Sequence, residues 1–364
     1  MEKEIQFWEA NRIVTLEEGG HQMFVYKADT NCPRPENFLS DFNLGIKKPN
    51  PSQVWKSISS ACESGWDFTD LSSIHTDQII PVDLNVIIAT NYWIIANLSA
   101  SLNRESDTSY YQEKHTKLLE AINKVLWDEE HGAWFDFDIL ANKKNFNFYP
   151  SNVYPLMIPG FNHYKYSDRV ANYVQKSGVL QFTGGIPSSL PATSSQQWDF
   201  PNVWAPNQHF VIQSFLASNN SFLEQEAVKQ AEKFIESVYN GLYQSEPGKE
   251  AGIWEKYDAR SSSGAPGAGG EYVVQEGFGW TNGAVLDLIW TFNSKLKSTR
   301  HLELGLTREQ HAGLVYTAAG FCAIVALVTL LKGIWKKRQC IESNDDAEAA
   351  QSLLATENEE EDDL

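Results

Sequence analysis

Residues 222–242 read FLEQEAVKQAEKFIESVYNGL, and apolar side chains recur in this stretch every three or four positions. A helix here places on one face Leu223, Ala227, Ala231, Phe234, Ile235, Val238 and Leu242. Residues 110–127 repeat the pattern with Tyr111, His115, Leu118, Leu119, Ile122, Val125 and Leu126. Residues 82–102 are apolar on most of their surface, and 207–217 and 280–296 also read as helices. Alternation with period two is scarce, so the sequence predicts a mainly α fold of paired helices.

Composition limits the classes of function. The chain has 364 residues, 42% of them hydrophobic, and a net charge of −18. It therefore has enough apolar side chains for a packed core, and its acidity argues against nucleic-acid binding. The acidity is concentrated in residues 341–364, which contain ten Asp and Glu and no Lys or Arg. Such a run repels itself, and we expect a disordered tail.

The four cysteines give weaker indications. Cys32, Cys62, Cys322 and Cys340 form no CxxC pair and no Cys/His cluster, so no metal site and no cofactor are predicted. Cys32 and Cys62 either pair in an oxidising compartment or remain two buried thiols.

An uncharged stretch precedes the acidic tail. Residues 312–331 read AGLVYTAAGFCAIVALVTLL, and as a helix they span roughly 30 Å, the thickness of a bilayer core. A basic cluster follows, Lys332, Lys336, Lys337 and Arg338, and places the C-terminal side in the cytoplasm. We therefore predict one transmembrane helix, with a buried soluble helix as the alternative. Two glycosylation sequons, at Asn97 and Asn219, agree with an extracellular body, whereas the polar start of the chain is not a signal peptide.

Loops between the predicted helices combine indole or phenol rings with carboxylates, Gly and Pro. They are CPRPENF (32–38), ESGWDF (63–68), GGIPSS (184–189), QWDFPNVWAPNQ (197–208) and WEKYDARSSSGAPGAGGEY (254–272). Aromatic rings stack on the apolar faces of sugars, and carboxylates and Arg bind sugar hydroxyls. Hydrolysis of a glycosidic bond needs two carboxyl groups. Several such loops, widely spaced in sequence, indicate one shared carbohydrate site.

These loops resemble the trehalase family over about residues 5–295. The segment QWDFPNVWAP (197–206) is similar to a trehalase signature, with Phe200 and Ala205 where the family usually has Tyr and Pro. PRPE (33–36), ESGWDF, EKYD (255–258), GGEY (269–272) and GFGWTNG (277–283) follow in family order. The resemblance implies an (α/α)6 barrel, the glucoamylase-like toroid, and inverting hydrolysis of α,α-trehalose to two glucose molecules. With the predicted membrane helix, the chain looks like a membrane-bound insect trehalase.

The resemblance also assigns roles to residues. Asp67 matches the general acid, which must carry a proton, and Glu255, rather than Glu271, matches the general base that activates water. Inversion implies a separation of roughly 6.5–9.5 Å between the two carboxyl groups. The implied sugar-contacting residues are Arg34, Glu36, Gly65, Glu271, Trp198, Asp199 and Trp204. A helix cap or a buried ion pair is the alternative for Asp67, and a structural ion pair is the alternative for Arg34.

The family pattern is incomplete at its N-terminal side. Trehalases normally have roughly two hundred further residues there, with another signature rich in Arg, Trp and Asp, so an N-terminally incomplete barrel with exposed apolar faces is expected. We predict a catalytic domain over 1–300, a juxtamembrane linker over 301–311, a transmembrane helix over 312–331 and a cytoplasmic segment over 332–364. The expected location is the plasma membrane, with trehalose as the partner of an extracellular domain. The alternative is a catalytically dead trehalase-like membrane protein that binds a sugar or a partner.

Overall fold

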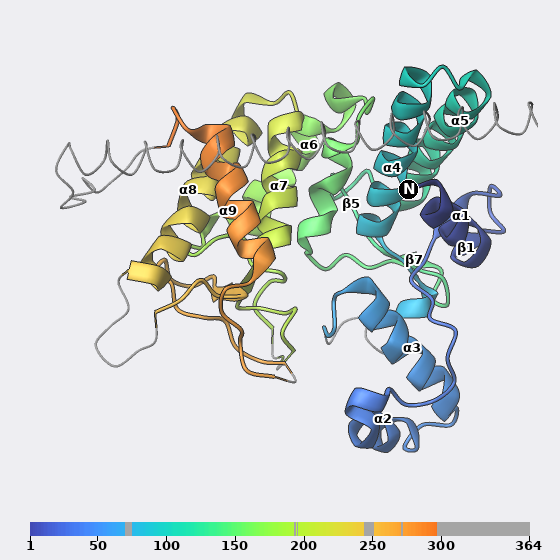
Figure 1. Cartoon of the computed structure of the whole chain (residues 1–364), viewed down its shortest axis with the longest axis horizontal. Helices are drawn as coiled ribbons and strands as arrows, with labels where there is room; N and C mark the ends of the chain where they lie inside the picture. The colour runs from blue at the N-terminus through green and yellow to red at the C-terminus, as the bar shows by residue number, and fades with distance from the viewer. Residues whose placement is uncertain (70–74, 193, 195, 244–250, 271, 297–364) are drawn as a thin grey trace, which may run out of the picture. The chain divides into compact units, whose positions relative to one another are not determined.

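The computed structural model describes residues 1–69, 75–192, 194, 196–243, 251–270 and 272–296 (Figure 1). Helices dominate this part of the chain. The α-helices are α1 (Glu2–Asn11), α2 (Phe38–Gly45), α3 (Pro51–Ser64), α4 (Val82–Ser101), α5 (Glu105–Ala121), α6 (Ser167–Ser177), α7 (Ala205–Ala217), α8 (Ser221–Tyr243) and α9 (Gly279–Phe292). Short 3-10 segments join them, the longest being η4 (Pro150–Met157). The mainly α class is confirmed, and the six-pair barrel stays a prediction.

The described strands are short and lie at the helix ends. β1 (Ile13–Thr15) pairs with β2 (Gln22–Phe24), and β4 (Trp127–Asp128) with β5 (Ala133–Trp134). β6 (Phe137–Asp138) lies between β3 (Ile79–Ile80) and β7 (Lys143–Lys144). β8 (Asn202–Trp204) pairs with β9 (Lys256–Asp258). All of these pairs are antiparallel, so the strands act as local clamps rather than as a sheet layer.

The helical periodicity located the long helices well. The apolar stripe of residues 222–242 becomes the inner face of α8, where Leu223, Ala227, Ala231 and Phe234 are fully buried. The stripe of residues 110–127 covers α5 and a π-helical turn over Ile122–Leu126 that continues it. The predicted helix over 280–296 is too long, because α9 ends at Phe292.

Helices that are adjacent in sequence pack together and share one large core. α4 packs against α5, and α7 contacts α8, α9 and η4. Figure 1 shows α7, α8 and α9 side by side. α4 is buried on most of its circumference, which explains its apolar sequence. The largest fully buried side chains in this core include Trp134, Tyr92, Tyr154, Tyr257, Phe215 and Phe234.

Polar contacts attach α3 to the body of the domain. The guanidinium Nε of Arg12 donates to both carboxylate oxygens of Glu63 at 3.0 Å. The backbone N–H of Lys27 donates to Glu63 Oε2 at 2.7 Å, and that of Ala28 donates to Ser60 Oγ at 2.9 Å. These bonds matter because α3 has a separate small apolar cluster around Val54 and does not share the main core.

Large apolar side chains are exposed on several helices, most of all on α9 and α2. On α9, Leu286 and Trp290 are 70% and 84% exposed, although Leu288 and Phe292 on the opposite face are buried. On α2, Phe38 and Leu39 are more than half exposed. A helix with apolar residues on both faces is typical of one that is packed on both sides.

The predictions for the C-terminal region and for the cysteines have different outcomes. The predicted transmembrane stretch 312–331 and the acidic tail lie outside the described residues. Among the described helices, none has the length and apolarity that crossing a bilayer requires. Cys32 and Cys62 do not form a disulfide, and Cys32 is exposed while Cys62 is half-buried, so neither the disulfide nor the pair of buried thiols describes them.

The α3 attachment gives a first testable prediction. Replacing Glu63→Ala removes the carboxylate from Arg12 and from the Lys27 N–H, and we expect it to lower the free energy of unfolding by roughly 1–3 kcal/mol. Urea denaturation followed by tryptophan fluorescence measures the loss. Glu113→Ala is the matched control, because Glu113 forms an exposed pair with Lys117 on α5. Equal denaturation midpoints for Glu63→Ala and the control would contradict the bracing role of Glu63.

Candidate active site

The end of α3 places Asp67. Asn50 caps the start of this helix by accepting a hydrogen bond from the Gln53 N–H, and Pro51 occupies its first turn. At the other end, Gly65 adopts the left-handed conformation at φ 76° and stops the helix. Asp67 therefore lies in an irregular segment just beyond the helix, half-buried, rather than on a helical face. The helix-cap alternative for Asp67 does not describe this placement.

The β8–β9 ladder places Glu255. Its register pairs Asn202 with Asp258, Val203 with Tyr257 and Trp204 with Lys256. Glu255 directly precedes β9, so its position is set by the strand that pairs with the QWDFPNVW segment. The Trp280 Nε1–H donates to the Glu255 carbonyl at 3.1 Å, which adds a contact from the start of α9.

Three hydrogen bonds join the Asp67 loop to the QWDFPNVW segment. The Trp198 N–H donates to the Phe68 carbonyl at 3.1 Å, and the Thr69 hydroxyl donates to Asp199 Oδ1 at 2.6 Å. The Gln197 side-chain amide donates to the carbonyl of Asp67 itself. Because the same segment also pairs with β9, the two candidate catalytic loops are fixed to one common strand.

Glu255 has the environment expected of a reacting carboxylate. It is 2% exposed, and its Oε1 accepts a hydrogen bond from the Tyr272 hydroxyl at 2.7 Å. Its Oε2 is buried without a hydrogen-bond partner among the described residues. A buried carboxylate oxygen without a partner costs free energy, and it is available to accept from a water or a substrate hydroxyl.

The charges of Asp67 and Glu255 both act on Lys256 and on Tyr272. Burial lowers the pKa of Lys256, and the negative charges of Glu255 and Asp67 both oppose that shift. Burial raises the pKa of Tyr272, and the hydrogen bond to Glu255 and the charges of Glu255 and Asp67 raise it further. The pKa values of one lysine and one tyrosine therefore depend on both carboxylates, although the two carboxylates are far apart in sequence.

Indole rings line the junction. Trp198 and Trp204 stack at a centroid distance of 4.1 Å with their planes 5° apart, and the Trp280 ring meets both edge-on. Trp66 contacts Trp198 at 5.0 Å. Trp198, Trp204 and Asp199 are all at most 5% exposed, so in this structure they pack on each other and on the loops.

Arg34 lies beside the Asp67 loop. Its guanidinium forms a two-bond pair with Asp41, with both N–O distances 2.8 Å, and its Cζ lies 4.9 Å from the centre of the Phe68 ring. The structure therefore shows the ion pair that was the alternative for Arg34, at a place next to the site. Glu36 and Gly65 are exposed, and Glu271 lies outside the described residues.

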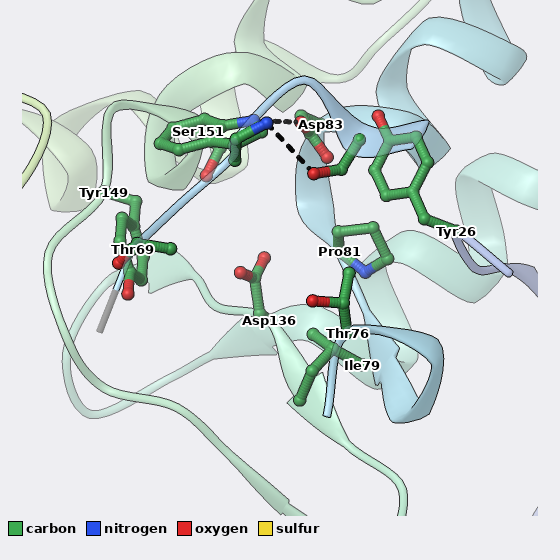
Figure 2. A pocket seen from close by; sticks show the side chains of 11 residues that line it. Tyr26, Thr69, Thr76, Ile79, Pro81, Asp83, Asp136, Tyr149 and Ser151 are labelled. Atoms are coloured by element: carbon green, nitrogen blue, oxygen red, sulfur yellow. Dashed lines mark hydrogen bonds between the residues drawn. The ribbon is translucent and has the colours of Figure 1, made fainter. Parts of the chain in front are cut away.

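A pocket opens beside Trp66 and contains a second pair of carboxyl groups, Asp83 and Asp136 (Figure 2). Asp83 accepts from the Trp66 indole N–H at 2.8 Å and from the Leu84 N–H at 2.6 Å. Asp136 accepts from the Val82 N–H at 2.8 Å, and its carboxyl group points into the pocket. Both carboxyl groups therefore bind backbone N–H groups at the start of α4, where the helix dipole favours negative charge.

The burial of this pair changes its protonation. Burial raises the pKa of Asp83 to about 6, although the Trp66 hydrogen bond opposes the shift. Burial raises the pKa of Asp136 to about 7, and the neighbouring Asp83 charge raises it further. Tyr149, which also lines the pocket, is 5% exposed. The lining residues contain hydroxyl and carboxyl groups but no Lys, Arg or His.

Sequence reasoning missed several of these residues. Gln197 and Tyr272 stood inside quoted motifs, but their spacing gave no reason to single them out. Asp136 follows a tight turn with no motif around it, and Asp83 read as part of an apolar helix. No group of three or more His, Cys, Asp or Glu side chains suited to a metal ion is present among the described residues.

Fold and site together define a mainly helical protein whose interhelical loops bring two carboxylates and an indole cluster to one place. The trehalase family model matches residues 1–293, and the chain belongs to the trehalase family. It is 36% identical to trehalase from Oryctolagus cuniculus, over 83% of this chain and 53% of that protein. It is 34% identical to trehalase from Apis mellifera, over 93% of this chain and 57% of that protein.

The chain thus spans about half the length of the curated relatives that it matches. Among solved structures, neutral trehalase from Saccharomyces cerevisiae matches with a TM-score of 0.55 at 20% identity, over 71% of this chain and 46% of that chain. That likeness supports the helical fold.

The Asp83–Asp136 pair makes stability depend on pH. A carboxyl group whose pKa is raised by folding stabilises the fold below its ordinary pKa of about 4, and this contribution is lost as pH rises through the folded value. Asp136→Asn keeps an oxygen for the Val82 N–H but carries no charge. We therefore expect the variant to match the wild type at pH 4 and to be more stable by about 1–3 kcal/mol at pH 8.

Urea denaturation at both pH values measures the effect. Asp136→Ala separates charge from capping, because it loses the acceptor as well and is expected to be less stable than wild type at pH 4. A gain for Asp136→Asn that is equal at pH 4 and pH 8 would exclude a role for ionisation.

Proposed function

We propose that this chain is the part of a trehalase that carries the acid and the base for hydrolysis of α,α-trehalose. One observation carries the proposal: the loop with Asp67 and the strand next to Glu255 are both bonded to the segment 197–204. Family membership supports trehalose as the substrate, because the curated relatives bear the name trehalase. Hydroxyl-rich and indole-rich surroundings suit a sugar.

In the proposed mechanism, Asp67 protonates the oxygen between the two glucose units as the bond to it breaks. Glu255 accepts a proton from a water that attacks the anomeric carbon from the opposite face, and the configuration inverts. Oε1 of Glu255 is held by Tyr272, which leaves the buried Oε2 for that water.

The proposal also covers the architecture of the catalytic domain and its location in the cell. The helical pairs would belong to a (α/α)6 barrel of which this chain supplies a part, in keeping with its length relative to the trehalases that it matches. The uncharged stretch 312–331 and the basic residues after it support a single-pass anchor at the plasma membrane, with the catalytic domain outside.

The second candidate function is a trehalase-like protein that binds sugar or a partner without turnover. The apolar side chains exposed on α9, Leu286 and Trp290, favour it, since they mark a face that another structure can cover. Binding of trehalose without release of glucose would distinguish this candidate from the enzyme.

Asp67→Asn and Glu255→Gln test the catalytic roles in the full chain. We expect each variant to lower the rate of trehalose hydrolysis by about 10²–10⁴-fold, because an acid or a base is lost while the shape is kept. Proton NMR of the products measures the rate and also shows whether one α-glucose and one β-glucose form, as inversion requires.

Glu113→Gln, an exposed change of the same type on α5, is the matched control and is expected to keep the wild-type rate. Full turnover by Asp67→Asn would refute its role as the acid. A wild-type chain that binds trehalose but releases no glucose would favour the second candidate.

A further inference from the structure

Lys256 is a fully buried cation between the two candidate catalytic loops. Its side chain is 0% exposed. The ammonium Nζ donates to Gln197 Oε1 at 2.9 Å and to the Gly269 carbonyl at 3.0 Å. It also lies 5.0 Å from the centre of the Trp204 ring and 5.8 Å from that of Tyr272. A lysine in such a place normally costs free energy, so its burial calls for a function.

Gln197 connects this cation to the acid. Its Oε1 accepts from Lys256, and its Nε2 donates to the carbonyl of Asp67. The carbonyl of Gln197 accepts from the Trp204 indole N–H at 2.9 Å and from the Asn202 side-chain amide at 2.9 Å, which fixes the residue at both ends. A continuous chain of hydrogen bonds thus runs from the ammonium group to the backbone of Asp67.

The base is coupled to the same cation through the chain itself. Glu255 is the neighbour of Lys256 in sequence, and its Oε1 accepts from Tyr272, whose ring also faces the ammonium group. Among the described residues, the titratable groups that face Lys256 are Glu255 beside β9, Asp67 on the loop after α3, and Tyr272 after the glycine-rich segment. Two of these groups are carboxylates, and the positive charge of Lys256 acts on both.

We propose that Lys256 is a positioning residue that acts with Gln197 to fix the distance between the acid and the base and supplies one positive charge to both. The assignment rests on the proposed function insofar as it takes Asp67 and Glu255 as acid and base. A compact ammonium group with three donors fits a fully enclosed place between two acceptors better than the planar guanidinium of Arg does.

Removing the charge tests this assignment. Lys256→Gln keeps an amide that can donate to its former acceptors, whereas Lys256→Met keeps only the length of the side chain. Loss of a nearby cation favours the protonated form of a carboxyl group. In both variants we therefore expect the titration midpoints of Asp67 and Glu255 to move upward by about one pH unit, measured from carboxyl ¹³C resonances in the full chain.

The variants Asp67→Asn and Glu255→Gln assign the two resonances by their disappearance. Lys233→Met is the matched control, because Lys233 is a half-buried lysine that donates to the carbonyls of Leu180 and Phe182, away from both carboxylates. It is expected to leave both midpoints unchanged. Unchanged midpoints in folded Lys256→Gln would overturn the proposal, and so would equal shifts in the Lys233 control.

Gln197→Leu separates the bridge from the charge. It breaks the link to Asp67 but leaves Lys256 in place, so we expect kcat for trehalose to fall at least tenfold with little change in KM. If the wild-type chain releases no glucose while the midpoints still move in Lys256→Gln, the proposed function fails and the shared-charge role of Lys256 stands. If the wild-type chain is active and Gln197→Leu keeps its kcat, the bridging role is refuted.

Discussion

The antiparallel pairing of β8 with β9 is the constraint on which the site depends. It places Trp204 opposite Lys256, and it connects a segment from before α7 to a segment from between α8 and α9. Gln197, at the other end of the first segment, bonds to the loop that follows α3. Three pieces of chain distant in sequence are therefore positioned by one ladder of three residue pairs. Such a short ladder is stable only because Val203 and Tyr257 within it are fully buried.

Helix ends explain why the reactive groups lie where they do. Gly65 ends α3 two residues before Asp67, and Asp83 and Asp136 bind the first N–H groups of α4 just behind Trp66. The main core holds α4, and the polar bonds of Glu63 and Ser60 hold α3, so the loop between the two helices has little freedom. The cost is that two carboxyl groups lie buried near each other, and burial raises the pKa of both toward neutrality. The two carboxyl groups thereby fix the start of α4, and they lower the stability of the fold at high pH.

Periodicity predicted the long helices and the core stripe of α8, because apolar spacing reports burial directly. It placed the end of α9 too late, since Leu296 continues the apolar spacing from Phe292, where the helix ends. The motifs brought Asp67, Glu255, Trp198 and Trp204 into one predicted site, and the structure does join their loops. Lys256 and Gln197 were not predicted, because their role arises from a strand register that no single segment encodes. The spacing of the cysteines along the sequence likewise could not predict that Cys32 is exposed.

Catalysis at this site has two requirements, the reacting groups themselves and their enclosure from water. Both carboxylates and the network that joins them lie within the described residues, and each contact in that network is made by this chain alone. Enclosure is the other requirement, because charge effects grow when water is excluded. Tyr272, which holds Glu255, is 46% exposed, and the outer face of α9 exposes Trp290. In the proposed hydrolysis, both the acid and the base lie among the described residues, so the rate depends chiefly on how well water is excluded around Tyr272 and Glu255.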